Sequence, residues 1–170
     1  MPKVHFVKKA RKDYPEAGIK KGESYYWWKF RYGGIQRSKT FPKKWQLTRS
    51  EFLSRVYQIE DELDNIDVII EGKKPEEVET EIQSFIDEIT MEIDELKDEC
   101  QEKLDNMPEQ LQDSSDAGVL LQERIEALGN WIDCLESIDI SIDEELKGED
   151  LEDRVNEILG EISDCCYEGE

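Results

Sequence analysis

Several features that identify familiar classes of protein are missing from this 170-residue sequence. It has no run of about 18 consecutive apolar residues, the length that a membrane-spanning helix needs. Its first residues, Met1 to His5, do not form a signal peptide. We therefore expect a cytoplasmic protein that makes no contact with a membrane.

Histidine and closely spaced cysteines are also scarce. The chain has one histidine, His5, and four cysteines (Cys100, Cys134, Cys165 and Cys166) without any Cys-x-x-Cys spacing. A structural zinc site needs four such ligands at short, regular spacings. We expect no metal site, and thiols that stay reduced, as is usual in a cytoplasm. A bond between the neighbouring Cys165 and Cys166 is not expected.

No catalytic motif stands out in the sequence. A nucleophile at the usual spacing from a base is absent, and so is a glycine-rich phosphate-binding loop. Asp and Glu are so abundant that many carboxylate pairs could be proposed, but none lies in a distinctive motif. We therefore predict a protein that is not an enzyme and that needs no cofactor.

Positive charge is concentrated in one part of the chain and scarce in the other. Residues 1–55 carry 15 Lys/Arg and 4 Asp/Glu, a net charge of +11, whereas residues 56–170 carry 7 and 39, a net charge of −32. Such an asymmetry indicates an end that faces nucleic acid and a separate acidic region. The alternative for the acidic part is that its carboxylates only solvate helices.

The aromatic residues gather in a segment, residues 24–41, that predicts a β-hairpin. A short strand at residues 4–7 precedes it, and glycines at 33–34 suit a two-residue turn because both positions tolerate positive φ. The pairs that follow are Tyr32 with Ile35, Phe30 with Arg37, Trp28 with Lys39 and Tyr26 with Phe41. Alternation then places Tyr26, Trp28, Phe30, Tyr32, Ile35 and Phe41 on one face, and Trp27, Lys29, Arg31, Gln36, Ser38 and Thr40 on the other.

Cations and exposed rings around this hairpin suit contact with nucleic acid. A two-stranded ribbon fits the DNA major groove, and aromatic rings and arginines stack on unpaired bases. The predicted nucleic-acid-binding residues are Trp27, Lys29, Arg31, Arg37, Lys39, Lys43 and Lys44. The alternative is a small basic fold whose rings form its core and whose lysines are merely solvated.

The hairpin segment also resembles a known domain. Residues 25–34 (YYWWKFRYGG), followed by residues 37–42 (RSKTFP) and a helix, are similar to the arm-type DNA-binding domain of tyrosine integrases. The resemblance covers about 55 residues and implies a three-stranded sheet against one helix, with DNA bound by the sheet. No recombinase catalytic domain follows. Residues 104–112 and 120–125 resemble uncharacterised phage and prophage proteins, which would imply a host cytoplasm.

The rest of the chain predicts helices. Thr48 and Glu51 form a capping box that opens a helix with apolar residues at 52, 56, 59 and 63, and this helix could continue to Gly72. From Pro75 to about Asn106, apolar residues three or four positions apart predict one long acidic helix. A helix with apolar residues at 121, 125, 128, 132 and 135 is expected to fold back against it. An extended connector at 137–143 and a last helix from about Glu149 follow.

Together these patterns predict an α+β protein: a small antiparallel β-hairpin or three-stranded sheet with one helix, followed by an acidic antiparallel helical hairpin or bundle. The expected domains are a basic aromatic head, residues 1–72, and an acidic helical body, residues 73–170. We expect a non-catalytic, phage-type accessory or regulatory protein. Its head would contact nucleic acid, with DNA favoured over RNA, and its body would self-associate or recruit a protein.

A second hypothesis assigns the function to the body. An acidic helical rod could imitate DNA and bind a host defence or nucleic-acid-processing protein as an inhibitor, because spaced carboxylates present the same electrostatics as phosphates.

Overall fold

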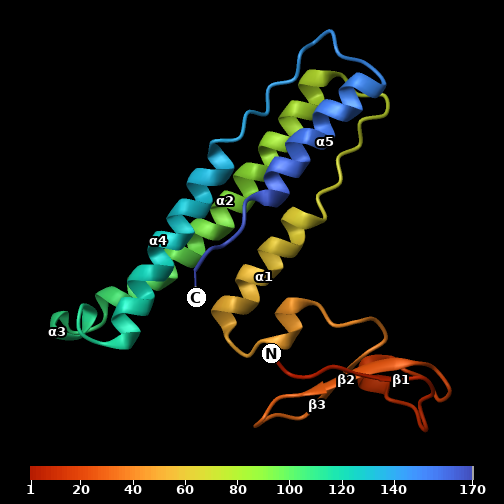
Figure 1. Ribbon diagram of the computed structural model, residues 1–170, viewed down its shortest axis with the longest axis vertical. Coiled ribbons are helices and arrows are strands. Elements are labelled where there is room, and N and C mark those ends of the chain that lie inside the picture. The colour runs from red at the N-terminus through yellow and green to blue at the C-terminus, as the bar shows by residue number, and fades with distance from the viewer. Residues whose placement is uncertain (170) are drawn as a thin grey trace. The chain divides into compact units, whose positions relative to one another are not determined.

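The computed structural model describes residues 1–169 and confirms the α+β class (Figure 1). The chain forms two compact units, Met1–Gln58 and Ile59–Glu170, here called the basic unit and the acidic unit. The basic unit carries 15 Lys/Arg and 4 Asp/Glu, and the acidic unit carries 7 and 39. The boundary between the two units, after Gln58, lies within the sequence of helix α1 (Glu51–Asp64). The expected division into domains of residues 1–72 and 73–170 stays a prediction.

The basic unit contains a three-stranded antiparallel sheet in the order β1-β2-β3. Its strands are β1 (His5–Val7), β2 (Tyr25–Lys29) and β3 (Ile35–Ser38). Two short 3₁₀ helices, η1 (Pro15–Ala17) and η2 (Lys44–Leu47), lie in the connections. The expected first strand and hairpin are therefore both present.

The register of the hairpin differs from the expected one. Tyr26 lies opposite Ser38 and Lys29 lies opposite Ile35, so residues 30–34 form a five-residue loop in place of a two-residue turn. A backbone hydrogen bond from Gly33 N to Phe30 O closes a turn inside this loop, and neither glycine of the loop has positive φ. Because the pairing shifts by an odd number of residues, the two faces of β3 are exchanged relative to β2.

The exchange changes which side chains share a face. Trp27, Lys29, Ile35 and Arg37 now lie on one face, which we call the Trp27 face. Tyr26, Trp28, Gln36 and Ser38 lie on the other, the Trp28 face. The placement of Ile35 with Trp28, and of Gln36 and Ser38 with Trp27, was therefore wrong.

Part of the Trp27 face is covered by the long connection between β1 and β2. Ala10 and Ile19 from this connection are buried with Tyr25, and Val7, Tyr14, Ala17 and Trp27 pack around them. Backbone hydrogen bonds hold the connection in place, for example from Ala10 N to Glu23 O at 2.8 Å. The pKa of Tyr25 is raised, first by its hydrogen bond with Tyr14 and second by burial. A small core thus lies on this side of the sheet.

Helix α1 is shorter at both ends than the sequence predicts. Its first residue is Glu51, and the Ser50 hydroxyl accepts a hydrogen bond from Leu53 N at 3.3 Å, so Ser50 takes the capping place expected for Thr48. The helix ends at Asp64 and does not continue to Gly72. Gly72 has a φ of 80° and lies in a turn directly before the next helix, a conformation that a helix cannot contain.

The acidic unit is built from helices whose apolar stripes were predicted. Helix α2 (Pro75–Asp105) confirms the long central helix. Its buried residues are Val78, Ile82, Ile86, Ile89, Ile93, Leu96, Cys100 and Leu104. Helices α4 (Asp116–Glu136) and α5 (Glu149–Asp164) follow, with the short α3 (Glu109–Gln112) between α2 and α4. No helix within residues 1–169 is long and apolar enough to cross a membrane.

Helix α4 packs against α2, as the sequence predicts (Figure 1). Of the apolar residues predicted for α4, Leu128 and Leu135 are buried, whereas those at 121, 125 and 132 are half-buried. Trp131, which no sequence pattern had identified, is buried as well. At the start of α4, Gly118 is buried, and a Cβ atom there would overlap the carbonyl oxygens of Leu111 and Gln112. The turn of α3 and the first turn of α4 therefore approach each other at a distance that only glycine permits.

A disulfide bond joins Cys134 of α4 to Cys165, directly after α5, with their Cα atoms 6.0 Å apart. Cys100 is buried and Cys166 is exposed, and both are free thiols. The expectation of four reduced thiols is therefore wrong for Cys134 and Cys165. The spacing of the cysteines carries no signal for this bond, because the two residues lie 31 positions apart in different elements and meet only in the folded acidic unit.

Candidate nucleic-acid interface

Three of the seven predicted binding residues lie together on the Trp27 face. Trp27 pairs directly with Arg37 across β2 and β3, and Lys29 follows Trp27 on the same strand face. Lys29 is exposed, whereas Trp27 and Arg37 are half-buried. The sheet thus brings one ring and two cations to one surface.

Trp27 and Arg37 are each engaged by other side chains of the basic unit. The Trp27 ring stacks on His5, with ring centroids 4.3 Å apart and an interplanar angle of 12°. The Arg37 guanidinium lies 4.2 Å from the centroid of the Tyr14 ring. A base that stacks on Trp27 would have to displace His5 or use the remaining exposed edge. The predicted binding role of Trp27 stays a prediction, whereas its packing on His5 and against the small core is observed.

The other four predicted residues surround the sheet. Arg31 lies in the hairpin loop, 5.3 Å from the Tyr32 ring centroid, and both residues are exposed. Lys43 and Lys44 lie at the start of η2, where Lys44 Nζ is 5.7 Å from the ring centroid of Tyr57. Arg31 and Lys44 thus each make a cation–π contact, and both side chains are exposed.

Lys39 has a carboxylate partner, Glu23. Its Nζ lies 3.2 Å from Glu23 Oε2, and half of the Lys39 side chain is exposed. The pKa of Glu23 is held below its usual value, first by the hydrogen bond from the backbone N–H of Lys20 and second by Lys39. Glu23 therefore stays ionised and offsets part of the charge of Lys39.

The Trp28 face carries a second group of rings, which the sequence analysis did not assign to binding. Phe6 of β1 lies opposite Tyr26 of β2, with ring centroids 5.0 Å apart. The Tyr26 ring meets the edge of Phe41 at 5.4 Å. We call Phe6, Tyr26 and Phe41 the aromatic row. Phe6 is 54 % exposed and Phe41 is 63 % exposed, so the row is open to solvent.

Of the two ring contacts in this row, the sequence analysis predicted only the one between Tyr26 and Phe41. The contact of Phe41 with Tyr26 was expected, but from the wrong register, and in the structure it forms after a bend at residues 39–40, beyond the end of β3. Phe6 was assigned to a strand, but its partner strand lies 19 residues further on, beyond any local pattern. Long-range pairing of this kind is decided by tertiary packing and not by neighbouring residues.

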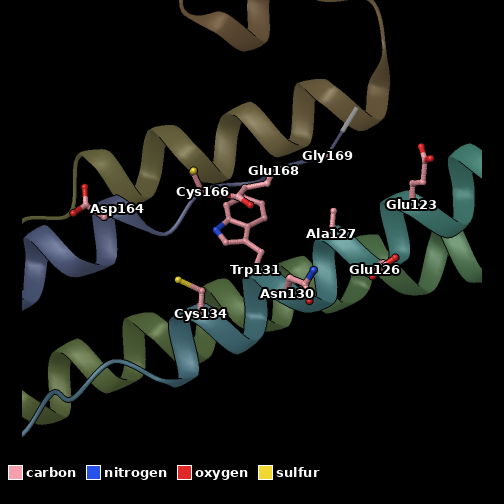
Figure 2. Close-up of a pocket in the computed structure, with 10 residues that line it drawn as sticks. All are labelled: Glu123, Glu126, Ala127, Asn130, Trp131, Cys134, Asp164, Cys166, Glu168 and Gly169. Atoms are coloured by element: carbon pink, nitrogen blue, oxygen red, sulfur yellow. The ribbon is translucent and has the colours of Figure 1, made fainter.

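The acidic unit has a groove of about 510 Å³ at the Cys134–Cys165 disulfide (Figure 2). Trp131 lies at its base, and its Nε1 donates a hydrogen bond to the Cys165 carbonyl at 3.0 Å. The charged residues that line the groove are Glu123, Glu126, Asp164 and Glu168. Without a lining cation, this groove would repel a phosphate. Tyr167 packs beside Trp131, and burial raises the pKa of its hydroxyl to about 12.

Carboxylates crowd elsewhere in the acidic unit as well. The pKa of Glu62 is raised, first by partial burial and then by the charges of Glu92, Glu88 and Asp61. Within residues 1–169, no group of three or more His, Cys, Asp or Glu side chains has an arrangement that could hold a metal ion. The charges of these neighbours therefore add to the effect of burial on the pKa of Glu62.

Comparisons with protein-family models, with curated proteins and with solved structures found no match for this chain. The site therefore has to be interpreted from its own geometry and charge.

Proposed function

We propose that this protein binds nucleic acid through the basic unit, without catalysis, as an accessory or regulatory factor. The observation that carries the proposal is the net charge of +11 on a unit of 58 residues that also presents rings at its surface. Only four carboxylates are available in the unit to offset 15 cations. Phosphate neutralisation by such cations supplies most of the affinity of non-specific binding.

The three-stranded sheet followed by one helix supports the resemblance to the arm-type DNA-binding domain of tyrosine integrases. That resemblance, and the phage-type role and host-cytoplasm location that it suggests, remain part of the proposal. The disulfide bears on the location, because such bonds persist mainly in oxidising compartments and are rare in the cytoplasm. A cytoplasmic location would require this bond to be protected or transient.

A salt titration of the whole chain tests the proposal. Binding to labelled single-stranded DNA, duplex DNA and RNA of equal length would be measured by fluorescence anisotropy at several salt concentrations. We expect the logarithm of the affinity to fall linearly with the logarithm of the salt concentration. Replacing Lys29, Arg31 and Lys44 by Gln should weaken binding and reduce the slope.

The acidic unit provides a matched control. Replacing its exposed lysines Lys74, Lys103 and Lys147 by Gln changes the net charge of the chain by the same amount. If both triple variants weaken binding equally, the effect is one of overall charge and the basic unit is not the site. The absence of salt-sensitive binding to all three nucleic acids would refute the proposed function.

A second proposal concerns the acidic unit. Its 39 carboxylates against 7 cations, and the mutual repulsion felt by Glu62, support an acidic surface that imitates DNA and inhibits a nucleic-acid-processing or defence protein. The test is an inhibition assay with enzymes that have basic clefts, at two salt concentrations. Salt-sensitive competition with DNA would support it, and unchanged enzyme activity would refute it.

Self-association through the acidic unit is a further part of the proposal. The exposed apolar residues of this unit are Ile69, Met91, Leu111 and Val119. Light scattering of the purified chain over a range of concentrations would measure the oligomeric state directly, and a constant monomer mass would leave recruitment of another protein as the remaining role.

A further inference from the structure

The aromatic row crosses all three strands of the sheet. Phe6 of β1 pairs with Tyr26 of β2, Tyr26 pairs with Ser38 of β3, and Phe41 returns over Tyr26 just after β3. The Tyr26 ring contacts both outer rings, Phe6 and Phe41, and each outer ring is more than half exposed. The row is therefore a continuous apolar surface and not a set of isolated side chains.

Packing within the basic unit does not account for this exposure. On the same face, Trp28 is 4 % exposed and forms part of the buried interior, together with Leu47, Phe52 and Val56 of the unit. On the opposite face, Tyr25 and Trp27 belong to the small core around Ala10. Clustered rings that remain outside both sets mark an interaction surface, because soluble proteins seldom expose contiguous apolar patches without a use.

The surroundings of the row favour nucleic acid over a hydrophobic protein surface as its ligand. The unit that carries it has a net charge of +11, and lysines lie at positions 39, 43 and 44, within three residues of Phe41. The hydroxyls of Ser38 and Thr40, 3.3 Å apart, provide hydrogen-bonding groups beside the row. Aromatic rings surrounded by cations are the usual means of holding unpaired nucleotides, with bases on the rings and phosphates on the cations.

Duplex DNA suits this face poorly. Groove recognition depends on polar side chains that reach base edges, such as Arg, Lys, Asn and Gln. On the Trp28 face, β1 and β2 contribute the rings of Phe6, Tyr26 and Trp28, and only β3 contributes polar side chains, Gln36 and Ser38. The bases of a duplex are already stacked on each other, so that their flat faces are out of reach of Phe6 and Phe41. Unpaired bases present these faces freely.

We propose that the aromatic row is a stacking surface for unpaired bases, so that the preferred ligand is single-stranded nucleic acid. This inference rests on the proposed function, because the cations of the basic unit supply the phosphate contacts. The inference goes beyond the proposed function by assigning base contact to Phe6, Tyr26 and Phe41, on the face opposite to Trp27.

The test compares two ligands with equal charge. The whole chain would be titrated with a 12-residue oligothymidylate and with an abasic oligonucleotide that has the same number of phosphates. We expect the oligothymidylate to bind about 10- to 100-fold more tightly, as the loss of base stacking predicts. A duplex of equal length should also bind less tightly than the oligothymidylate.

Substitutions test which residues produce the preference for the oligothymidylate. Replacing Phe6 and Phe41 by Leu keeps apolar packing against Tyr26 but removes the flat rings, and should abolish the preference while binding of the abasic ligand is retained. Ile35→Ala is the control, because Ile35 is 46 % exposed on the opposite face and should leave the preference unchanged. Circular dichroism melts would show that all variants fold.

The outcomes separate the two proposals. Equal affinity for the oligothymidylate and the abasic ligand, or a preference that survives in the Leu variant, would overturn the stacking surface while leaving the proposed function in place. Loss of the preference in Ile35→Ala alone would move base contact to the Trp27 face and would also overturn it. If neither ligand binds at any salt concentration, the proposed function fails as well.

Discussion

The two units of this protein expose different chemistry. In the acidic unit, the stripes of Val, Ile and Leu on α2 and α5 are buried, and carboxylates dominate the surface. Its exposed apolar residues are aliphatic and come from different elements. The basic unit instead exposes Phe6, Tyr32 and Phe41 among cations. One surface is therefore suited to a negatively charged ligand with flat rings, and the other repels such a ligand.

The comparison implies that the rings of the basic unit have different roles: the buried rings stabilise the fold, and the exposed rings contact a ligand. Trp28→Ala should destabilise the unit by about 3–5 kcal/mol, the usual cost of removing a large buried ring. Its Nε1 makes no hydrogen bond within residues 1–169, so the loss is one of packing. Hydrogen exchange of β2 amides would measure the effect for this unit alone.

Trp27→Ala provides the contrast on the same strand. Because Trp27 is only half-buried and stacks on His5, we expect a smaller loss, about 1–2 kcal/mol, which includes the ring pair. If the β2 amides of the two variants were equally protected from hydrogen exchange, burial would not determine how much each ring contributes to stability.

The disulfide distinguishes the acidic unit from the basic one, which has no cysteine. The bond closes a loop of 31 residues, and Cys134→Ser should therefore destabilise the acidic unit by about 3–4 kcal/mol in the chain-entropy model. Thermal melts with and without reductant would measure the change. Cys166→Ser is the control, since this exposed thiol should not affect stability; a melting temperature that reductant leaves unaltered would contradict the structural role of the bond.

Two glycines of α4 test how tightly the acidic unit is packed. Gly118→Ala should destabilise it by about 1–3 kcal/mol, because the new methyl group would overlap the carbonyls of Leu111 and Gln112. Gly129→Ala meets no atom within 4 Å and should stabilise the same helix by about 0.5–1 kcal/mol. Chemical denaturation of the two variants would measure the change in the free energy of unfolding. The two changes must have opposite signs, and equal signs would contradict this account of the packing.

The smallest expected effect concerns Glu62, whose pKa is raised first by partial burial and then by neighbouring carboxylates. Because the pKa of Glu62 is raised in the folded chain above its usual value of 4.5, ionised Glu62 opposes folding above that pH. Glu62→Gln should stabilise the protein at neutral pH by about 0.2–0.5 kcal/mol, the size of one like-charge pair. The gain should disappear as the pH falls below 4.5, because Glu62 is then neutral in both states. A gain that persists at low pH would point to packing instead.

The same contrast explains how much could be predicted from the sequence. The stripes of α2 and α5 consist of apolar residues three or four positions apart, so both helices were predicted from the sequence. The register of β2 and β3 was missed, because a five-residue loop replaces the glycine turn and no local pattern distinguishes the two. Trp131, the disulfide and Phe6 depend on contacts between distant segments, which composition and spacing do not encode.

Photochemical crosslinking tests most directly which surface binds nucleic acid. The whole chain would be irradiated with a single-stranded oligonucleotide that contains 5-iododeoxyuridine, and the linked peptides would be identified by mass spectrometry. We predict linkage at Phe6, Tyr26 or Phe41, reduced by competing oligothymidylate and not by the abasic ligand. Linkage at Trp27 or Tyr32 alone, or within the acidic unit, would contradict the assignment of base contact to the aromatic row.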